Sequence, residues 1–197
     1  MSLKTRVAAA VAETKGLLDR LLLEQADQLL AAARLLAQTL KAGGKVVLFG
    51  NGGSAADAQH LAAEFVNRFQ VERPPLAALA LTTDTSILTS IANDYDFEEV
   101  FAKQVRALGR TGDAALGIST SGHSANVVQG LTTARAMGLK TLALSGGHGG
   151  PVAQAADLAI VVPSQNTPRI QEVHITVGHI LCDLVDFLLF PEKFPQT

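Results

Sequence analysis

The feature that most constrains this chain is a glycine-rich turn between an apolar run and an alanine-rich segment. Residues 45–49 are mostly apolar and stop at Gly50-Asn51-Gly52-Gly53-Ser54, after which no helix breaker occurs for about four helical turns. This order predicts the strand, tight loop and helix start of an open α/β sheet, where backbone N–H groups point at a ligand. Four positions separate His60 from Glu64, so both lie on one face of that helix. The stretch predicts half of a binding site.

Five short apolar runs separated by helical segments predict the fold class. The expected strands are residues 45–49, 76–81, 114–118, 141–144 and 158–162. The expected helices are residues 54–69, 86–92 with 97–108, 124–137, 151–156 and 168–189. Strands that alternate with helices imply right-handed crossovers and a mostly parallel sheet. The sequence therefore predicts an α/β protein.

Composition narrows the class of protein further. A chain of 197 residues with 48% hydrophobic residues and a mean hydropathy of +0.25 suits one domain with an ample core. A net charge of −2 without basic runs gives no reason to expect nucleic acid as a partner. The single Cys182 excludes an internal disulfide and favours a reducing compartment. Neither a signal peptide nor a membrane span is expected, so we expect a soluble, cytoplasmic protein without a membrane partner.

The first 42 residues precede the first strand and predict two helices, spanning 3–42. Leucine and valine stripes run through both halves, a break is expected near residues 24–27, and Gly43-Gly44 closes the second helix. We expect a helical hairpin whose excess apolar surface supports oligomerisation. The alternative is that these helices only cap the domain. The α/β core is then residues 43–190 of a single domain, and residues 191–197 form a loose tail.

The loop that follows the third expected strand indicates a phosphate site. It reads Ser119-Thr120-Ser121-Gly122-His123-Ser124 and leads directly into a helix, so hydroxyls and backbone N–H groups converge at a positive helix end. The alternative is an ordinary N-cap by Ser124, which explains one hydroxyl residue of the four. The turn at residues 50–54 lacks a Walker A lysine and a complete G-x-G-x-x-G, so nucleotide binding is weakly supported.

The five histidines divide into loop and helix positions. His123 and His148 lie in glycine-rich loops, where either is compatible with a plain surface role. His174 and His179 lie on the apolar last helix, near Gln171. Together with His60 and Glu64, they form either an acid/base or a metal site, or they are hydrogen-bonded structural residues. Gln171 and His179 are eight positions apart, about 12 Å of helical rise, so both reach one atom only from an irregular helix or from different subunits.

These motifs together resemble the sugar isomerase (SIS) domain family, and within it the phosphoheptose isomerase branch. The resemblance spans about residues 40–190. It rests on the segments Gly50-Asn51-Gly52-Gly53-Ser54, Asp57-Ala58-Gln59-His60, Glu64, Asn93-Asp94, Ser119-Thr120-Ser121-Gly122, Ser124-Ala125-Asn126 and Arg169-Ile170-Gln171-Glu172 with His174 and His179. It implies a three-layer, flavodoxin-like fold with a five-stranded parallel sheet, and a homotetramer with active sites at subunit interfaces.

The resemblance also implies an activity and a set of site residues. The expected reaction converts D-sedoheptulose 7-phosphate to D-glycero-D-manno-heptose 7-phosphate through an enediol(ate), the first step toward ADP-heptose and the heptose of lipopolysaccharide. Glu64 is the expected base and His179 the expected acid. One zinc ion per subunit is expected on His60, Glu64, Gln171 and His179. The expected substrate contacts are Asn51, Gly52, Gly53, Glu64, Asn93, Asp94, Ser119, Thr120, Ser121, Ser124 and Gln171.

Two other functions are compatible with a related fold. One is that of the non-catalytic SIS proteins that associate with the bacterial replication initiator DnaA. The other is a phosphosugar-sensing regulatory module, although no DNA-binding segment is attached. The presence of both Glu64 and His179 favours the enzyme. His123 stands where relatives often have Asn or Lys, which indicates either an added phosphate contact or a tolerated change.

Overall fold

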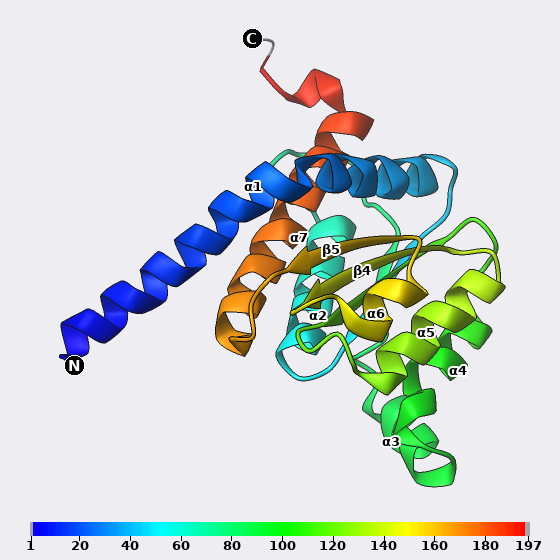
Figure 1. Cartoon of the computed structure of the whole chain (residues 1–197). Coiled ribbons are helices and arrows are strands. Elements are labelled where there is room, and N and C mark those ends of the chain that lie inside the picture. Colours follow the sequence, from blue (N-terminus) through cyan, green and yellow to red (C-terminus); the bar gives the residue numbers. More distant parts are fainter. Residues whose placement is uncertain (1, 196–197) are drawn as a thin grey trace.

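The computed structural model describes residues 2–195 and shows a parallel sheet between two layers of helices (Figure 1). The sheet has the order β2-β1-β3-β4-β5, with every neighbouring pair parallel. The strands are β1 (Val46–Gly50), β2 (Ala78–Ala80), β3 (Ala114–Ser119), β4 (Lys140–Gly146) and β5 (Leu158–Val162). The helices are α1 (Leu3–Lys41), α2 (Gly53–Val66), α3 (Thr85–Asp94), α4 (Val100–Leu108), α5 (Ala125–Ala136), α6 (Gly150–Ala155) and α7 (Thr167–Leu189), with short 3-10 turns η1 (Phe97–Glu99) and η2 (Pro191–Lys193). The expected α/β class, five parallel strands and three layers are confirmed.

Two apolar cores hold the layers together. Helices α1, α2 and α7 pack on one face of the sheet, where residues such as Leu36, Leu61 and Val177 are buried. Helices α4, α5 and α6 pack on the other face, around Phe49, Phe101 and Leu131. The central strands β1 and β3 are buried along their whole lengths, as expected of a parallel sheet that is covered on both sides. No helix within residues 2–195 is long and apolar enough to cross a membrane.

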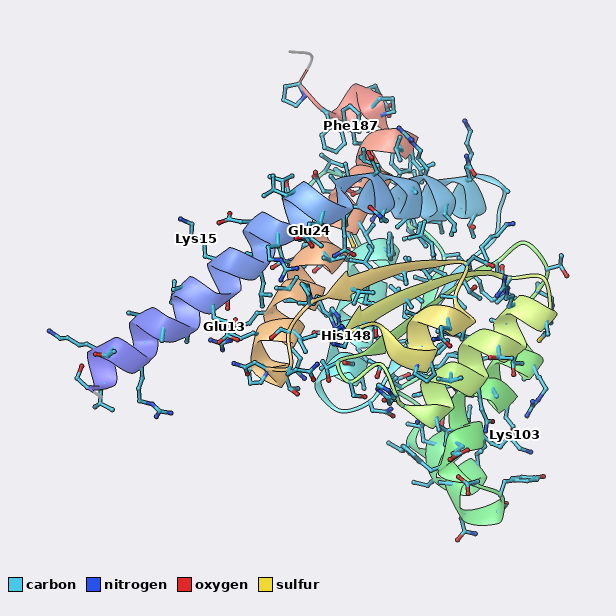
Figure 2. The ribbon with its side chains drawn as sticks, viewed as in Figure 1. Glu13, Lys15, Glu24, Lys103, His148 and Phe187 are labelled. Carbon is cyan, nitrogen blue, oxygen red and sulfur yellow. The ribbon has the colours of Figure 1, made fainter. Side chains whose placement is uncertain are left out.

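The N-terminal region differs from the expected hairpin. It is one long helix, α1, with a kink at Gln25 (φ −136°), inside the range where a break was expected. The second half packs on the sheet, whereas the first half runs beside α7, where Leu17 and Leu21 are buried, and its N-terminal turns project beyond the body (Figures 1 and 2). The Gln25 side chain donates to the Val161 carbonyl at 2.7 Å and accepts from the Val161 N–H at 2.8 Å. The kink therefore places an amide that pairs with the otherwise open edge strand β5.

Two elements, β2 and α2, are shorter than the sequence predicted. Strand β2 covers three residues because Pro74 and Pro75 precede it, and the N–H of Leu76 is bonded to Phe65 of α2 instead of a strand. Helix α2 ends at Val66, three residues before the predicted end, because the Arg73 side chain donates hydrogen bonds to the carbonyls of Glu64 and Phe65. The predicted tail begins with the turn η2, and residues 196–197 lie outside the described residues.

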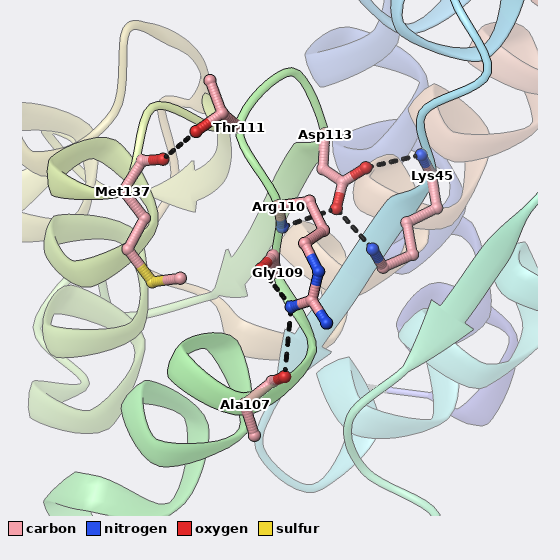
Figure 3. Close-up of polar contacts among 7 residues, drawn as sticks. All are labelled: Lys45, Ala107, Gly109, Arg110, Thr111, Asp113 and Met137. Atoms are coloured by element: carbon pink, nitrogen blue, oxygen red, sulfur yellow. Dashed lines mark hydrogen bonds and ion pairs between the residues drawn. The ribbon is translucent and has the colours of Figure 1, made fainter.

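Asp113 joins the amino ends of β1 and β3, at the edge of the sheet opposite the ligand-facing loops (Figure 3). Its carboxylate accepts the backbone N–H groups of Lys45 and Arg110, each at 2.9 Å, and pairs with the Lys45 ammonium group. Burial raises the pKa of Asp113, but the hydrogen bonds from Lys45 and Arg110 outweigh it, so the pKa lies below its ordinary value. This contact fixes the two strands whose other ends carry the candidate site.

Candidate active site

The strand order reverses direction between β1 and β3, and this point locates the candidate site. In open parallel sheets, ligands bind outside the carboxyl ends of the strands at such a switch point. The turn at residues 50–53 follows β1 and leads into α2, and the loop at residues 119–124 follows β3 and leads into α5. The two segments singled out in the sequence therefore lie on adjacent strands.

The helices α2 and α7 bring three of the expected acid, base and metal residues together. The Nε2 atoms of His60 and His179 are 2.9 Å apart, and His60 Nε2 is 3.4 Å from Glu64 Oε1. The ring of Phe69 stacks on His179 with centroids 5.4 Å apart. His60 is half exposed and Glu64 is 22% exposed, so the cluster is open to solvent on one side. It combines a carboxylate and two imidazoles that a ligand can reach.

A close helix–helix contact produces this cluster. A Cβ on Gly178 would lie 2.6 Å from the Leu61 side chain, so only glycine allows α7 to approach α2 this closely. Both helices follow parallel strands and run in the same direction, which aligns His179 with His60. The cluster therefore depends on Leu61 and Gly178, which neighbour His60 and His179, as well as on the two histidines.

Gln171 lies at a different level of the same interface. Its amide packs against Gly53, where a Cβ would come within 2.2 Å of Gln171 Nε2. Gly53 precedes His60 by seven residues, about 10 Å of rise, and Gln171 precedes His179 by eight, about 12 Å. Helix α7 is continuous through Gln171, so no irregular start brings the amide to His179. Within one chain, Gln171 faces the turn of residues 50–53, and the expected four-residue set is not gathered at one point.

Arg73 fixes the end of α2 that carries Glu64. Its guanidinium donates to the carbonyls of Glu64, Phe65 and Asn67, which lack helical partners at a helix end. It also pairs with Asp186 of α7 at 2.9 Å, and both side chains are almost fully buried. Burial raises the pKa of Asp186 above its ordinary value, partly offset by Arg73. Sequence reasoning did not include this pair in the site, although Asp186, a carboxylate among the apolar residues at the end of α7, is an available signal.

The loop at residues 119–124 gathers hydroxyl groups at the start of α5. The Oγ of Ser119 lies 2.9 Å from that of Ser124 and 3.4 Å from that of Ser121. Ser124 is the N-cap residue by position, but its hydroxyl makes no capping hydrogen bond, so the ordinary N-cap explanation does not account for it. Three hydroxyls and the unpaired N–H groups of a helix start suit a phosphate monoester.

A neighbouring loop holds this loop in place. Gly122 has φ +72°, and a Cβ there would lie 2.5 Å from the Gly149 carbonyl, so glycine is required on both counts. The Gly122 carbonyl accepts the N–H of Val152 at 3.0 Å. His123 is exposed, and its Nδ1 donates to the Ser121 carbonyl at 2.6 Å.

Three other expected residues lie outside the cluster and the serine loop. Asn51 is at the turn after β1, where its amide pairs with Asn126, a residue that the sequence-based site did not include. Asn93 and Asp94 end α3, where they are exposed and hydrogen-bonded to each other at 2.8 Å. Helix α3 buries none of its residues, and Figure 1 shows it at the far end of the molecule from α1. One chain does not bring Asn93 and Asp94 to the cluster.

His148 and His174 are distinguished by burial. His148, labelled in Figure 2, is exposed and lines a pocket together with Arg20 of α1. His174 is 1% exposed, and its Nε2 donates to the Ser145 carbonyl at 3.1 Å, while its buried Nδ1 has no partner. Burial lowers the pKa of His174 to about 4, so the ring is neutral near pH 7. His174 therefore joins α7 to the end of β4 as a structural residue.

The donor types at the cluster suit a zinc ion. Imidazole nitrogen and carboxylate oxygen are ordinary zinc ligands, and His60, His179 and Glu64 present two imidazoles and one carboxylate from adjacent positions. Within residues 2–195, no three His, Cys, Asp or Glu side chains are placed where they could hold a metal ion without moving. Tetrahedral ligands at about 2.0 Å from zinc are about 3.3 Å apart, so the two rings, now in hydrogen-bond contact, would separate slightly. These three residues fit the ion, whereas Gln171 of the same chain does not reach them.

Comparison with known proteins places the chain in a family. The SIS domain profile matches residues 11–146. The chain is 50% identical to the phosphoheptose isomerase of Thermodesulfovibrio yellowstonii over 96% of this chain and 94% of that protein. It is 59% identical to the phosphoheptose isomerase of Desulfovibrio desulfuricans over 85% of this chain and 80% of that protein.

Solved structures agree in fold. The phosphoheptose isomerase GmhA of Neisseria gonorrhoeae is 47% identical with a TM-score of 0.88, covering 94% of this chain and 99% of that chain. The sugar isomerase domain of an RpiR transcription factor from Sphaerobacter thermophilus has a TM-score of 0.66 at 20% identity, covering 98% of this chain and 94% of that chain, and shares the fold alone. The replication-regulator alternative is not favoured. The chain belongs to the phosphoheptose isomerase family of SIS domain proteins.

Proposed function

We propose that this isomerase converts D-sedoheptulose 7-phosphate to D-glycero-D-manno-heptose 7-phosphate through an enediol(ate). The observation that carries the proposal is the cluster of His60, Glu64 and His179 in a chain that also has a serine loop at a helix start. Aldose–ketose isomerisation needs a base near the carbon beside the carbonyl and an acid near the oxygens. A phosphate anchor several bonds away supplies positioning.

The residues divide this work between binding and proton transfer. Ser119, Thr120, Ser121 and Ser124 hold the phosphate, and the turn at Asn51, Gly52 and Gly53 lets the backbone approach the sugar closely. Glu64 takes a proton from C1 of the ketose, and the electron pair left on C1 forms the C1–C2 double bond. The ring nitrogen of His179 that would not bind the metal supplies a proton to O2 as the carbonyl bond opens. Return of a proton to C2 and loss of the proton on O1 give the aldose.

A zinc ion, one per subunit, belongs to the same proposal. His60, Glu64 and His179 would hold it, with Gln171 as the fourth candidate. When bound, the ion would polarise the substrate oxygens as a Lewis acid. One Glu64 oxygen, Oε1, faces His60, which leaves Oε2 to accept the proton from carbon. Metal analysis of protein purified without chelators tests this part separately from turnover.

We propose a homotetramer whose active sites combine residues of neighbouring chains. The first half of α1 exposes Leu3, Val7 and Val11, which are 82%, 65% and 64% exposed. An open groove of ≈ 620 Å³ lies between it and α7, and Arg169 and Glu172, on either side of Gln171 in α7, line this groove. Helix α3 also lacks buried residues, so a partner would cover both elements. This arrangement would bring Asn93 and Asp94 of one chain to the site of another.

The biological setting follows from the cysteine content and the charge of the chain. Cys182 is buried and forms no disulfide in the described chain. A free thiol of this kind is typical of proteins in the reducing cytoplasm. We place the reaction in the cytoplasm, at the first step toward ADP-heptose and lipopolysaccharide. Neither nucleic acid nor a membrane is proposed as a partner, since the net charge is −2.

The deciding experiment is an isomerase assay of the purified full chain with D-sedoheptulose 7-phosphate, with and without added zinc. The expected result is formation of an aldoheptose phosphate, faster with zinc and slower after chelation. No turnover under either condition would overturn the proposed reaction. Binding of the replication initiator by an inactive protein would support the regulatory alternative instead.

A further inference from the structure

Asn126 connects the two loops of the candidate site. Its side-chain Nδ2 donates to Asn51 Oδ1 at 2.9 Å, and Asn51 Nδ2 donates to Asn126 Oδ1 at 2.9 Å. Asn126 is the second residue of α5, just after Ser124, whereas Asn51 follows β1 and precedes α2. In residues 2–195, no other side-chain hydrogen bond joins the turn of residues 50–53 to residues 119–126. The pair therefore links the carboxyl ends of β1 and β3.

The two helices that meet at this link lie on opposite faces of the sheet. Residues Ala58 and Leu61 of α2 belong to one core, and Val127 and Leu131 of α5 belong to the other. Apolar packing on one face therefore does not set the position of the other helix start directly. Beyond the last paired residues of the ladder, Gly50 and Ile118, the amide pair sets how far apart the loops lie.

The pair also fixes the orientation of the amide groups. Each side chain has two N–H donors and two acceptor lone pairs, and the reciprocal bonds use one of each. Asn126 is 3% exposed, so loss of its partner would leave a buried polar group without a hydrogen bond. Asn51 is only partly buried and retains one N–H and one lone pair that face away from the pair. Its orientation toward a ligand is thus set by a residue that a ligand does not reach.

We propose that Asn126 is a positioning residue of this isomerase, which acts through Asn51 to hold the sugar-facing turn at a fixed distance from the phosphate loop. The inference rests on the proposed function, in which phosphate binds at residues 119–124 and sugar at residues 50–53. A phosphate anchored at residues 119–124 places the reacting carbons correctly only if residues 50–53 stay at a fixed distance from that loop. The amide pair is then a determinant of the length of sugar phosphate that the site accepts.

The test compares Asn126→Ala with wild type in turnover of D-sedoheptulose 7-phosphate and in inhibition by inorganic phosphate. We expect kcat to fall tenfold to hundredfold, while the inhibition constant of inorganic phosphate changes less than threefold. Phosphate alone needs only the serine loop, whereas turnover needs both loops. A parallel loss of phosphate affinity would overturn the inference, because Asn126 would then only shape the phosphate loop.

Asn51→Ala and the double variant complete a cycle that measures coupling. The loss in kcat/KM for the double variant should be no greater than that of the more impaired single variant. Losses that multiply would contradict a shared role. The matched control is Gln104→Ala, which removes a buried amide of α4 that donates to the Leu81 and Val100 carbonyls. It should lower stability and leave kcat/KM within threefold of wild type.

Asn126→Asp provides a readout that a purely structural role would not move. A protonated carboxyl group reproduces the donor and acceptor of the amide, whereas a carboxylate faces Asn51 Oδ1 without a proton. The kcat/KM of Asn126→Asp relative to wild type should therefore rise as pH falls. A ratio independent of pH would overturn the pairing role. An inactive wild type would overturn the proposed function itself, and an active wild type with an unaffected Asn126→Ala would overturn only this inference.

Discussion

Glu64 presents the most direct prediction at the scale of single residues. Its carboxylate is 22% exposed and lies beside His60, where it is placed to accept a proton from carbon. Glu64→Gln keeps the shape but removes the base, so turnover should fall by at least a thousandfold, within the range for loss of general base catalysis. Steady-state kinetics on the purified variant, with its oligomer checked by light scattering, measures the effect.

A matched control comes from the loop that follows α2. Within residues 2–195, Glu72 is 88% exposed and pairs only with Arg68, so Glu72→Gln should leave turnover unchanged. If Glu64→Gln retained wild-type turnover, the assigned base would be wrong. If Glu64→Gln lost its oligomeric state, the loss of turnover would be caused by failed assembly and not by removal of the base.

His174 leads to a prediction about stability and pH. Burial lowers its pKa to about 4, from 6.5, so between these values the unfolded chain binds a proton that the folded chain does not. The stability is fully present above pH 6.5 and is lost as pH falls toward 4, by roughly 3 kcal/mol in total. His174→Gln retains a donor for Ser145 but does not titrate, so its stability should vary less with pH than that of wild type. Urea unfolding at pH 7 and pH 5 measures this difference.

The comparison with an exposed histidine makes the pH prediction specific. His148→Gln changes a histidine that is open to solvent (Figure 2), and it should follow wild type at both pH values. If the difference in the free energy of unfolding between His174→Gln and wild type were the same at pH 7 and at pH 5, it would contradict a neutral buried ring.

At the scale of elements, the junction of α2 and α7 depends on a buried ion pair. Arg73 and Asp186 are 0% and 2% exposed, and Arg73 also holds the carbonyls that end α2 next to Glu64. Arg73→Met should lower the free energy of unfolding by roughly 3–5 kcal/mol, because it leaves a buried carboxylate unpaired. Guanidinium chloride unfolding at pH 7 measures this loss.

Two further variants separate charge from packing in the same element. Arg73→Met with Asp186→Leu should recover part of the stability, since no unpaired charge then remains. The recovered protein should still have low kcat, because the Glu64 carbonyl has lost its partner. Arg68→Met, in an exposed ion pair in the loop just after α2, should alter stability by less than about 0.5 kcal/mol. A large effect of Arg68→Met would point to a general weakness of the α2 end.

At the scale of the whole molecule, the expected site residues of one chain lie too far apart to form a single site. The serine loop precedes α5, the cluster lies two turns along α2, and Asn93 and Asp94 lie on the exposed α3. If neighbouring chains share each site, two inactive variants should complement each other. We expect Asp94→Ala and Glu64→Gln, refolded or coexpressed together, to regain up to a quarter of wild-type turnover, as random mixing leaves one unaltered site type.

The controls for complementation use the same residues in one chain. A chain that carries both substitutions, mixed with Glu64→Gln, should regain nothing. Mixing the separate variants without subunit exchange should also leave them inactive. If exchanged mixtures stay inactive while native mass spectrometry shows mixed oligomers, Asp94 and Glu64 act within the same chain or Asp94 is not part of the site.

Much of the fold could be predicted from the sequence because its signals are local. The apolar runs predicted all five strands, and β5 has the predicted limits of residues 158–162. The break in α1 was expected near Gln25, where a polar stretch interrupts the leucine stripes. The serine loop and the spacing of His60 and Glu64 were also evident, because hydroxyls before a helix and residues four apart are patterns of neighbouring positions.

The tertiary structure decided which distant residues meet. The sequence did not indicate that α1 would extend outward instead of folding back, since that depends on Gln25 pairing with Val161, 136 positions later. It did not show that Asn126 would pair with Asn51, or that Gln171 would face Gly53 at a level apart from His179. Local sequence specifies which surface an element can bury, whereas the free energy of packing across the whole sheet selects its partner. The residue types of the site were thus determined by the sequence, and their distances by the packing of α2, α5 and α7 on a single sheet.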